Sequence, residues 1–98
     1  GVCAVSGTGQ GEGFIKCAAA YDVAARMSYA RQTLAQATDT LVFETLAAYR
    51  IGAGMVACDA GGSVVAPFNT IGMYRGWIMA DGEIVVGTHK ELHRMGLA

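Results

Sequence analysis

The sequence has 98 residues and a mass of 10.1 kDa, which allows one small domain. Only 15% of its residues are charged, against about 25% in an average soluble domain, and the formal net charge is -1. This charge argues against a nucleic-acid partner, and no apolar stretch is long enough to predict a transmembrane helix.

The composition also indicates whether the surface of the chain packs against other segments and in which compartment the protein resides. Apolar residues make up 53% of the sequence and 14 residues are glycine, so there is too little polar surface to face water on all sides. We therefore expect the chain to be part of a larger assembly. Its three cysteines, Cys3, Cys17 and Cys58, cannot all pair with one another and show no C-x-x-C spacing. This favours the reducing cytoplasm and argues against a zinc site.

The first half of the sequence predicts one strand followed by two helices. Val2–Ser6 is apolar and carries β-branched residues, which is typical of a short buried strand. The next segment, Gly7–Gly13, has glycine at alternate positions, which favours a loop whose backbone can approach a ligand closely. Apolar residues at helical spacing, with many alanines, predict a helix over Phe14–Tyr29, and a second helix runs from Thr33 until Gly52 ends it.

Two local side-chain patterns support these helices. Asp22 and Arg26 have the i,i+4 spacing of a helical ion pair. Thr33 and Gln36 have the spacing of a capping box, in which each side chain accepts a hydrogen bond from the backbone N–H of the other residue. The second pattern predicts that a helix begins at Thr33.

The second half of the sequence predicts two β-hairpins. Its four strands are expected at Met55–Asp59, Val64–Asn69, Tyr74–Ala80 and Glu83–Thr88. The turn of the second hairpin is Asp81-Gly82, which is a strong hairpin signal. The polar tail from His89 is expected to fray. Helices and strands are therefore grouped rather than alternating, which predicts the α+β class.

The glycine segment Gly7–Gly13 is the strongest candidate site. In a turn between a strand and a helix, its backbone N–H groups would lie beside the positive end of the helix dipole, which favours an anion or a developing oxyanion. The Thr8 hydroxyl adds one more donor there. The spacing matches neither the G-x-G-x-x-G dinucleotide fingerprint nor a phosphate-binding P-loop. A tight turn without a ligand is the alternative on composition alone.

Two motifs in the right order resemble one enzyme family. They are Ser6-Gly7-Thr8-Gly9-Gln10-Gly11-Glu12, with an Ala-rich helix through Ala20-Tyr21-Asp22 after it, and Pro67-Phe68-Asn69-Thr70 followed by Gly72-Met73-Tyr74-Arg75. Together they are similar to the plant-type L-asparaginase/isoaspartyl peptidase family, whose members are N-terminal-nucleophile hydrolases. The resemblance covers Val2 to about Arg75 and fades from Trp77 onward.

The resemblance implies a fold and an activity. The fold is a four-layer αββα sandwich, and the precursor cleaves itself before a threonine that becomes the nucleophile and first residue of the β subunit, with its α-amino group as base. Residues 1–98 would be the C-terminal part of that β subunit, and their partners would be the upstream β-subunit segment and the α subunit in an (αβ)2 heterotetramer. The implied cytoplasmic reaction, which needs no cofactor, hydrolyses the side-chain amide of L-asparagine and β-aspartyl (isoaspartyl) peptides. These residues alone are expected to be inactive.

The resemblance assigns roles only within the glycine segment. Thr8, through its hydroxyl, and Gly9, through its backbone N–H, match the oxyanion hole. Gly9 and Gly11 match residues whose backbone contacts the bound aspartyl group. Gln10 departs from the family, which often has threonine there, and this difference is expected to alter the substrate pocket.

A rival hypothesis is a non-catalytic anion- or nucleotide-binding module that uses the same Gly7–Gly13 loop. Outside that loop the candidates favour structural roles. His89 and His93 would share one face of a helix, but no third metal ligand is nearby. Arg75 is expected to form a structural ion pair. The three cysteines are expected to be buried and inert.

Overall fold

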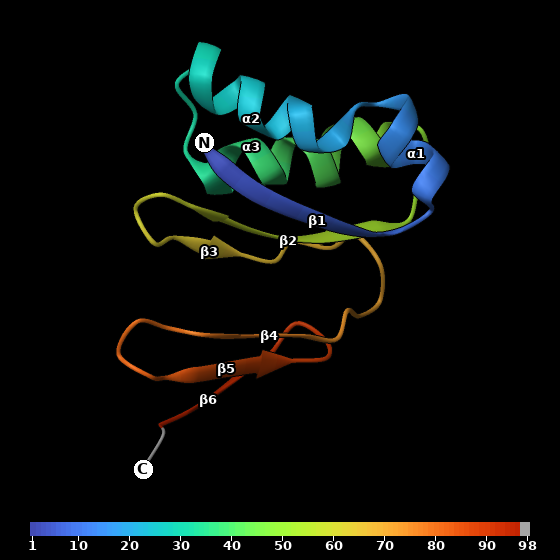
Figure 1. Cartoon of the computed structure of the whole chain (residues 1–98). Helices are drawn as coiled ribbons and strands as arrows, with labels where there is room; N and C mark the ends of the chain where they lie inside the picture. Colours follow the sequence, from blue (N-terminus) through green and yellow to red (C-terminus); the bar gives the residue numbers. More distant parts are fainter. Residues whose placement is uncertain (97–98) are drawn as a thin grey trace.

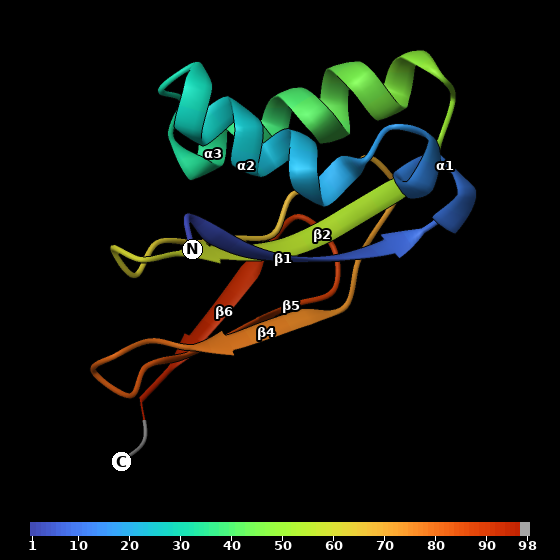
Figure 2. The ribbon, with the colours of Figure 1, turned by 45° about the horizontal axis from the view of Figure 1, so that its top comes forward.

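The computed structural model describes residues 1–96 of the chain and arranges them in three layers. Helices form the first layer, a three-stranded sheet lies beneath them, and a second three-stranded sheet faces the other side of the first (Figure 1). A tilted view shows the same order of layers (Figure 2). The described chain therefore has mixed α and β structure with antiparallel strands, as the sequence predicts.

The secondary structure begins with one strand and continues through the helices to the remaining strands. The elements are β1 (Cys3–Gly9), α1 (Gly11–Lys16), α2 (Ala19–Tyr29), α3 (Leu34–Asp39), the π-helical segment η1 (Thr40–Leu46), β2 (Ala53–Asp59), β3 (Val64–Val65), β4 (Arg75–Ile78), β5 (Ile84–Gly87) and β6 (Leu92–Met95). The strand order is β1-β2-β3 in the first sheet and β4-β5-β6 in the second.

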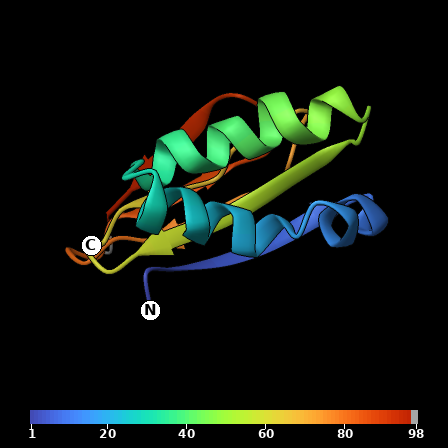
Figure 3. The ribbon, with the colours of Figure 1, turned by 90° about the horizontal axis from the view of Figure 1, so that it is seen from above.

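The hydrophobic core lies between the helices and the first sheet. Alternate residues of β1 and β2 face the helices, because successive side chains of a strand point to opposite sides. On β2 these are Ala53, Met55 and Ala57, which are buried, and on β1 they are Cys3 and Val5. The helices contribute Ala19, Val23, Leu34, Ala37, Leu41, Val42 and Leu46. Figure 3 shows α2 and the segment formed by α3 and η1 side by side over the first sheet.

The predicted helix over Phe14–Tyr29 is in fact two helices. α1 begins earlier, at Gly11, and the chain leaves helical geometry at Ala18, whose φ of 48° is left-handed. Gly13 allows α1 to lie close to Ile51, since a Cβ there would come within 2.3 Å of the Ile51 side chain. The break was not predictable from the spacing, because alanine at position 18 favours a helix on propensity alone.

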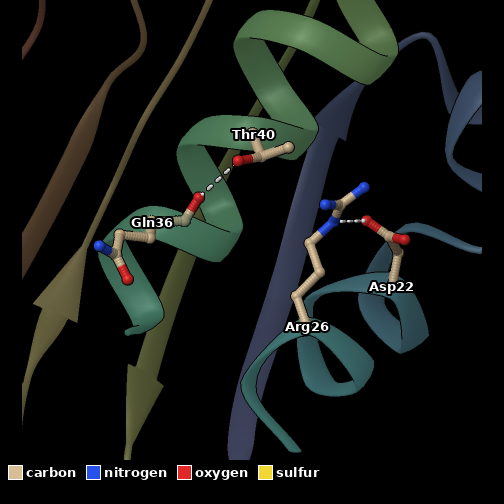
Figure 4. A network of polar contacts seen from close by, with 4 residues as sticks. All are labelled: Asp22, Arg26, Gln36 and Thr40. Atoms are coloured by element: carbon tan, nitrogen blue, oxygen red, sulfur yellow. Dashed lines mark hydrogen bonds and ion pairs between the residues drawn. The ribbon is translucent and has the colours of Figure 1, made fainter. Parts of the chain in front are cut away.

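The two local patterns in the helices are confirmed. The Arg26 guanidinium donates from Nε to the Asp22 carboxylate at 2.7 Å (Figure 4). In the capping box, the Gln36 N–H donates to the Thr33 hydroxyl at 3.1 Å, and the Thr33 N–H donates to Gln36 Oε1 at 2.9 Å. Figure 4 also shows the Thr40 hydroxyl bound to the Gln36 carbonyl at the start of η1.

The two predicted hairpins are present, and the first is shorter than expected. Its second strand, β3, covers only Val64–Val65, because Pro67 has no N–H to donate. The chain nevertheless stays beside β2 in the same register, since Phe68 forms an isolated bridge with Gly54 and Asn69 donates its N–H to the Ala53 carbonyl at 2.9 Å. Pro67 still accepts a hydrogen bond from the Met55 N–H at 3.0 Å. In the second hairpin Gly82 has a φ of 90°, and the Asp81 carboxylate accepts the Glu83 N–H at 2.9 Å. This turn confirms the Asp81-Gly82 prediction.

The prediction of a frayed tail from His89 is wrong. Residues Leu92–Met95 form β6, which pairs with β5 in antiparallel register from Ile84↔Met95 to Gly87↔Leu92. The Arg94 guanidinium also donates to the Glu83 carboxylate at 2.8 Å. The polar composition of the tail is that of an exposed edge strand, in which all four residues face solvent.

Asn69 ties the helical layer to the first sheet. Its Oδ1 accepts the Ala53 N–H at 2.8 Å, while its Nδ2 donates to the Val42 carbonyl at 2.9 Å and to the Ile51 carbonyl at 3.0 Å. The Val42 carbonyl belongs to η1, where the wider π-helical turn leaves acceptors without their usual α-helical partners. One side chain therefore holds η1, the turn after it and the start of β2 together.

Replacing Asn69 by alanine should destabilise the full-length protein by about 3 kcal/mol, because partly buried backbone groups lose their partners. Thr33→Ala is the matched control, since it removes an exposed cap and should cost about 1 kcal/mol. Denaturant midpoints of both variants measure the difference. Equal losses would show that Asn69 is an ordinary surface contact.

Candidate active site

The glycine segment is not the loop that its composition favours. Gly7, Thr8 and Gly9 are the last residues of β1, and Gly11 and Gly13 lie in α1, so that only Gln10 separates strand from helix. The prediction that Gly7–Gly13 forms a loop is therefore wrong, while its role at an anion or oxyanion stays a prediction. The alternate glycines instead serve close packing: the Phe14 ring lies where a side chain of residue 7 would be, within 2.5 Å of an added Cβ.

The register of β1 decides where its backbone donors point. Gln10 donates its N–H to the Gly52 carbonyl at 3.1 Å, so even-numbered residues of β1 direct their backbone groups at β2. The backbone groups of Ala53 and Met55 point the opposite way, to Asn69 and Pro67. Odd-numbered residues of β1 therefore direct their N–H groups away from β2. The N–H of Gly9 lies on this outer side.

The outer edge of β1 is open in the described residues 1–96. β1 is the first strand of its sheet and pairs only with β2. Figure 3 shows β1, in dark blue, at the margin of the sheet with no strand beyond it. The Gly9 N–H is thus a strand donor at a free edge, and it is available to an acceptor from outside this part of the chain.

Thr8 directly precedes that donor in the chain. The side chains of Cys3 and Val5 face the helices, so Thr8, at an even position, faces the second sheet. Its side chain is exposed, and its partner across the sheet is Gly54, which has no side chain to cover it. The hydroxyl of Thr8 and the N–H of Gly9 therefore belong to neighbouring residues at one corner of the sheet, next to its free edge.

Gly9 requires glycine for two physical reasons. Its φ of 120° lies in a region that L side chains rarely adopt. A Cβ there would also lie 2.3 Å from the Gly52 carbonyl oxygen and 3.0 Å from Ala53 Cα. The backbone at Gly9 therefore lies close against Gly52 and Ala53, the first residue of β2.

The other residues of the segment take different places. Gly11 is exposed at the first position of α1, with nothing within 4 Å of an added Cβ, and its N–H is one of the donors that a helix start leaves free. Gln10 does not point into the space beside Thr8 but back at the sheet, where its Oε1 accepts the Gly52 N–H at 2.7 Å. The expectation that Gln10 alters the substrate pocket directly therefore has no support in this geometry.

A hollow of about 460 Å³ runs along the free edge of β1 beneath the first two helices. It is lined by Val5, Gly7, Thr8, Gly9, Gly11, Phe14, Ile15, Ala18, Ala19, Ala20 and Tyr21. All three residues assigned from the family resemblance, Thr8, Gly9 and Gly11, line it. The structure thus brings the candidate site residues together, although sequence reasoning placed them in a loop.

The remaining candidates do not form a site. His89 lies in a turn and His93 in β6, so they do not share a helix face, and residues 1–96 contain no cluster of three side chains suited to a metal ion. Arg75 forms no ion pair there: its guanidinium donates to the Met73 carbonyl at 2.8 Å and lies over the Phe68 ring. Cys58 is exposed and Cys3 and Cys17 are half-buried, which corrects the expectation of three buried thiols. No helix of the described chain is long and apolar enough to cross a membrane.

Comparison with known proteins gives the class of this chain. A family model described as asparaginase matches residues 1–88, so the likeness extends beyond Trp77, where the motifs fade. The chain is 47% identical to an isoaspartyl peptidase of Escherichia coli (strain K12) over 88 residues, which are 90% of this chain and 27% of that protein. It is 47% identical over 79 residues to a putative isoaspartyl peptidase/L-asparaginase of Dictyostelium discoideum, covering 80% of this chain and 22% of the relative.

A relative from a plant is also similar to this chain. The probable isoaspartyl peptidase/L-asparaginase 2 of Arabidopsis thaliana is 40% identical over 80 residues, covering 82% of this chain and 24% of that protein. The chain belongs to the asparaginase family of hydrolases. It spans about a quarter of the length of these curated relatives.

Replacing Gly9 by alanine should destabilise the full-length protein by about 1–3 kcal/mol, because the side chain is forced into a strained φ and against the Gly52 carbonyl. Gly11→Ala is the matched control: the added Cβ meets nothing within 4 Å at the start of α1, so stability should change by less than about 0.5 kcal/mol. Thermal melts of the two variants compare them. A Gly9→Ala variant as stable as the parent would contradict the close approach of β1 to β2.

Proposed function

We propose that the complete protein hydrolyses the side-chain amide of L-asparagine and β-aspartyl (isoaspartyl) peptides through an N-terminal threonine that lies upstream of these residues. In this proposal the present segment supplies the oxyanion hole from the Thr8 hydroxyl and the Gly9 N–H. Gly9 and Gly11 also contact the bound aspartyl group through their backbones. The curated relatives, which are named as isoaspartyl peptidases and L-asparaginases, support the reaction class.

The observation that carries the proposal is the free donor at the end of β1. Most strand N–H groups are used within a sheet, whereas that of Gly9 points away from β2 at an open edge. A hydroxyl donor, Thr8, is its immediate neighbour. In the proposal these two donors converge on the negative charge that develops on a carbonyl oxygen, and the strand N–H needs no reorganisation during the reaction.

The chemistry follows from that placement. The upstream threonine hydroxyl attacks the side-chain carbonyl of the substrate while its own α-amino group takes the proton. The negative charge on the tetrahedral oxygen is held by the Thr8 hydroxyl and the Gly9 N–H. Collapse breaks the C–N bond, the leaving nitrogen takes the proton as ammonia or as the amine of the next residue, and an ester to the threonine remains. Water then hydrolyses this ester and releases the aspartyl product.

The partners of this segment are proposed from its uncovered surfaces. The upstream β-subunit segment would pair with the free edge of β1 along Cys3–Gly7, which leaves Gly9 open at the active site. A further helical layer over the second sheet would complete the four-layer αββα sandwich, with the α subunit supplying the rest of both sheets. We propose an (αβ)2 assembly in the cytoplasm, formed after autocatalytic cleavage of one precursor.

The rival hypothesis is a non-catalytic anion- or nucleotide-binding module that uses the same Gly7–Gly13 segment. The strand geometry of Gly7–Gly9 weighs against it. In β1 successive N–H groups point alternately toward β2 and toward the free edge. Gly7 and Gly9 share the outer side, but a strand spaces them apart along the edge, so their N–H groups do not converge on one phosphate.

Replacing Thr8 by valine in the complete protein should lower kcat about 10²–10³-fold, because it removes one oxyanion donor and keeps the shape of the side chain. KM should change much less, since the hydroxyl contributes little before the attack. Release of aspartate from a β-aspartyl dipeptide and of ammonia from L-asparagine measures both constants.

Thr8→Ser is the control for this measurement, because it keeps the hydroxyl and should retain most of the turnover. An unchanged kcat with a lowered melting temperature in Thr8→Val would instead make Thr8 a residue of strand stability only. Failure of the unmodified protein to release aspartate or ammonia would overturn the proposed reaction itself.

The isolated residues 1–98 should show no hydrolysis, because they contain neither the nucleophile nor its α-amino base in this proposal. The same assay applied to the purified segment, with the complete protein as positive control, tests this expectation. Measurable turnover of a β-aspartyl dipeptide by the segment alone would place the nucleophile among these residues.

A further inference from the structure

At the junction of β1 and α1, two backbone N–H groups compete for the single backbone carbonyl of Gln10. The antiparallel register continues to the pair Gln10 and Gly52, in which the Gln10 N–H donates to the Gly52 carbonyl at 3.1 Å. In such a pair the second residue normally returns the bond, from its N–H to the carbonyl of the first. The Gln10 carbonyl is not available for this, because it accepts the Gly13 N–H at 3.0 Å in the first turn of α1.

The side chain of Gln10 supplies the missing acceptor. Its Oε1 accepts the Gly52 N–H at 2.7 Å, so Gly52 is held through both its N–H and its carbonyl by one residue. The backbone carbonyl of Gln10 starts the helix while its side-chain carbonyl completes the last pair of the ladder. An apolar or shorter side chain at this position would leave the Gly52 N–H without that partner.

The Gly52 peptide is in turn the surface against which Gly9 lies. The Gly52 carbonyl oxygen would be 2.3 Å from a Cβ at Gly9. On the other side, Asn69 holds the flanking groups, the Ile51 carbonyl at 3.0 Å and the Ala53 N–H at 2.8 Å. Glycine has more backbone conformational freedom than other residues. The direction of the Gly9 N–H therefore depends on the hydrogen bonds that fix the neighbouring residues.

We infer that Gln10 is a positioning residue for the hydrolysis: by holding Gly52 it fixes the direction in which Gly9 presents its N–H to the oxyanion. This inference rests on the proposed function, because it needs the Gly9 N–H to act in the reaction. Gln10 itself touches no reacting atom. A donor that is displaced or loosened stabilises the transition state less, while the substrate contacts made by residues other than Gly9 are preserved.

The test is Gln10→Met in the complete protein, which keeps the length of the side chain and removes its strong acceptor. The matched control is Gln36→Met. Gln36 makes the same kind of bond, from Oε1 to the Thr33 N–H at 2.9 Å, in the capping box of α3 away from the site. A side chain that only adds stability would affect the melting temperature in both variants and kcat in neither.

The expected result is a fall in kcat of about tenfold or more per titrated active site in Gln10→Met, of the size that a misplaced catalytic group produces. KM for a β-aspartyl dipeptide should stay within about threefold, since Gly9 makes only one of the contacts to the bound substrate and most of the loss falls on the transition state. Gln36→Met should keep the parental kcat. If Gln10→Met does not fold, Gln10→Asn replaces it, because its carbonyl is one methylene short of Gly52 and should lower kcat in the same direction.

Two results would overturn the inference while leaving the proposed function intact. In the first, the unmodified protein turns over substrate and a folded Gln10 variant has the same kcat as Gln36→Met. The second is a raised KM with an unchanged kcat in the Gln10 variant, which would make Gln10 a substrate contact. An unmodified protein that hydrolyses neither substrate overturns the proposed function and this inference together.

Discussion

The antiparallel pairing of β1 with β2 is the interaction on which the rest of this structure depends. It joins the first strand to a strand that follows all the helices, from Cys3↔Asp59 to Gly9↔Ala53. One side of this pair carries the small and apolar side chains that pack under the helices. The other side faces the second sheet. The helical layer and both sheets are therefore arranged around these two strands.

The register of this pair also creates the candidate site. Because the last hydrogen-bonded pair is Gln10 with Gly52, the neighbouring Gly9 directs its N–H outward. A shift by one residue would turn that donor into the sheet and move the Thr8 side chain to the helical face. Close packing at Gly9 and Gly54, where added Cβ atoms would meet the Gly52 carbonyl and Met73, opposes such a shift. The glycines therefore stabilise the pairing register of β1 with β2 and do not form a flexible loop.

Local signals in the sequence predicted local structure well. The capping box at Thr33 and Gln36, the Asp22–Arg26 pair and the Asp81-Gly82 turn all depend on residues close together in the chain. The resemblance of two short motifs also identified the family correctly. These features need no knowledge of distant contacts, which is why they were accessible from sequence.

The errors share a cause, since each depends on residues far apart in the sequence. Gly7–Gly9 extends β1 because a partner strand some 45 residues later accepts it, and composition favoured a loop. The tail after His89 is a strand because β5 offers it an edge. The role of Gln10 as an acceptor for Gly52 was likewise hidden, because a glutamine between two glycines carries no signal for a distant backbone donor.

The most direct test of the account is a crystal structure of the complete protein with L-aspartate bound in the active site. The account predicts that one carboxylate oxygen of the ligand lies within about 2.7–3.1 Å of both Thr8 Oγ1 and the Gly9 nitrogen, as an oxyanion would. The contrary result is a further strand paired along the whole outer edge of β1, with one of its carbonyls accepting the Gly9 N–H. In that case the donor would belong to the sheet, and the oxyanion hole would have to be built elsewhere.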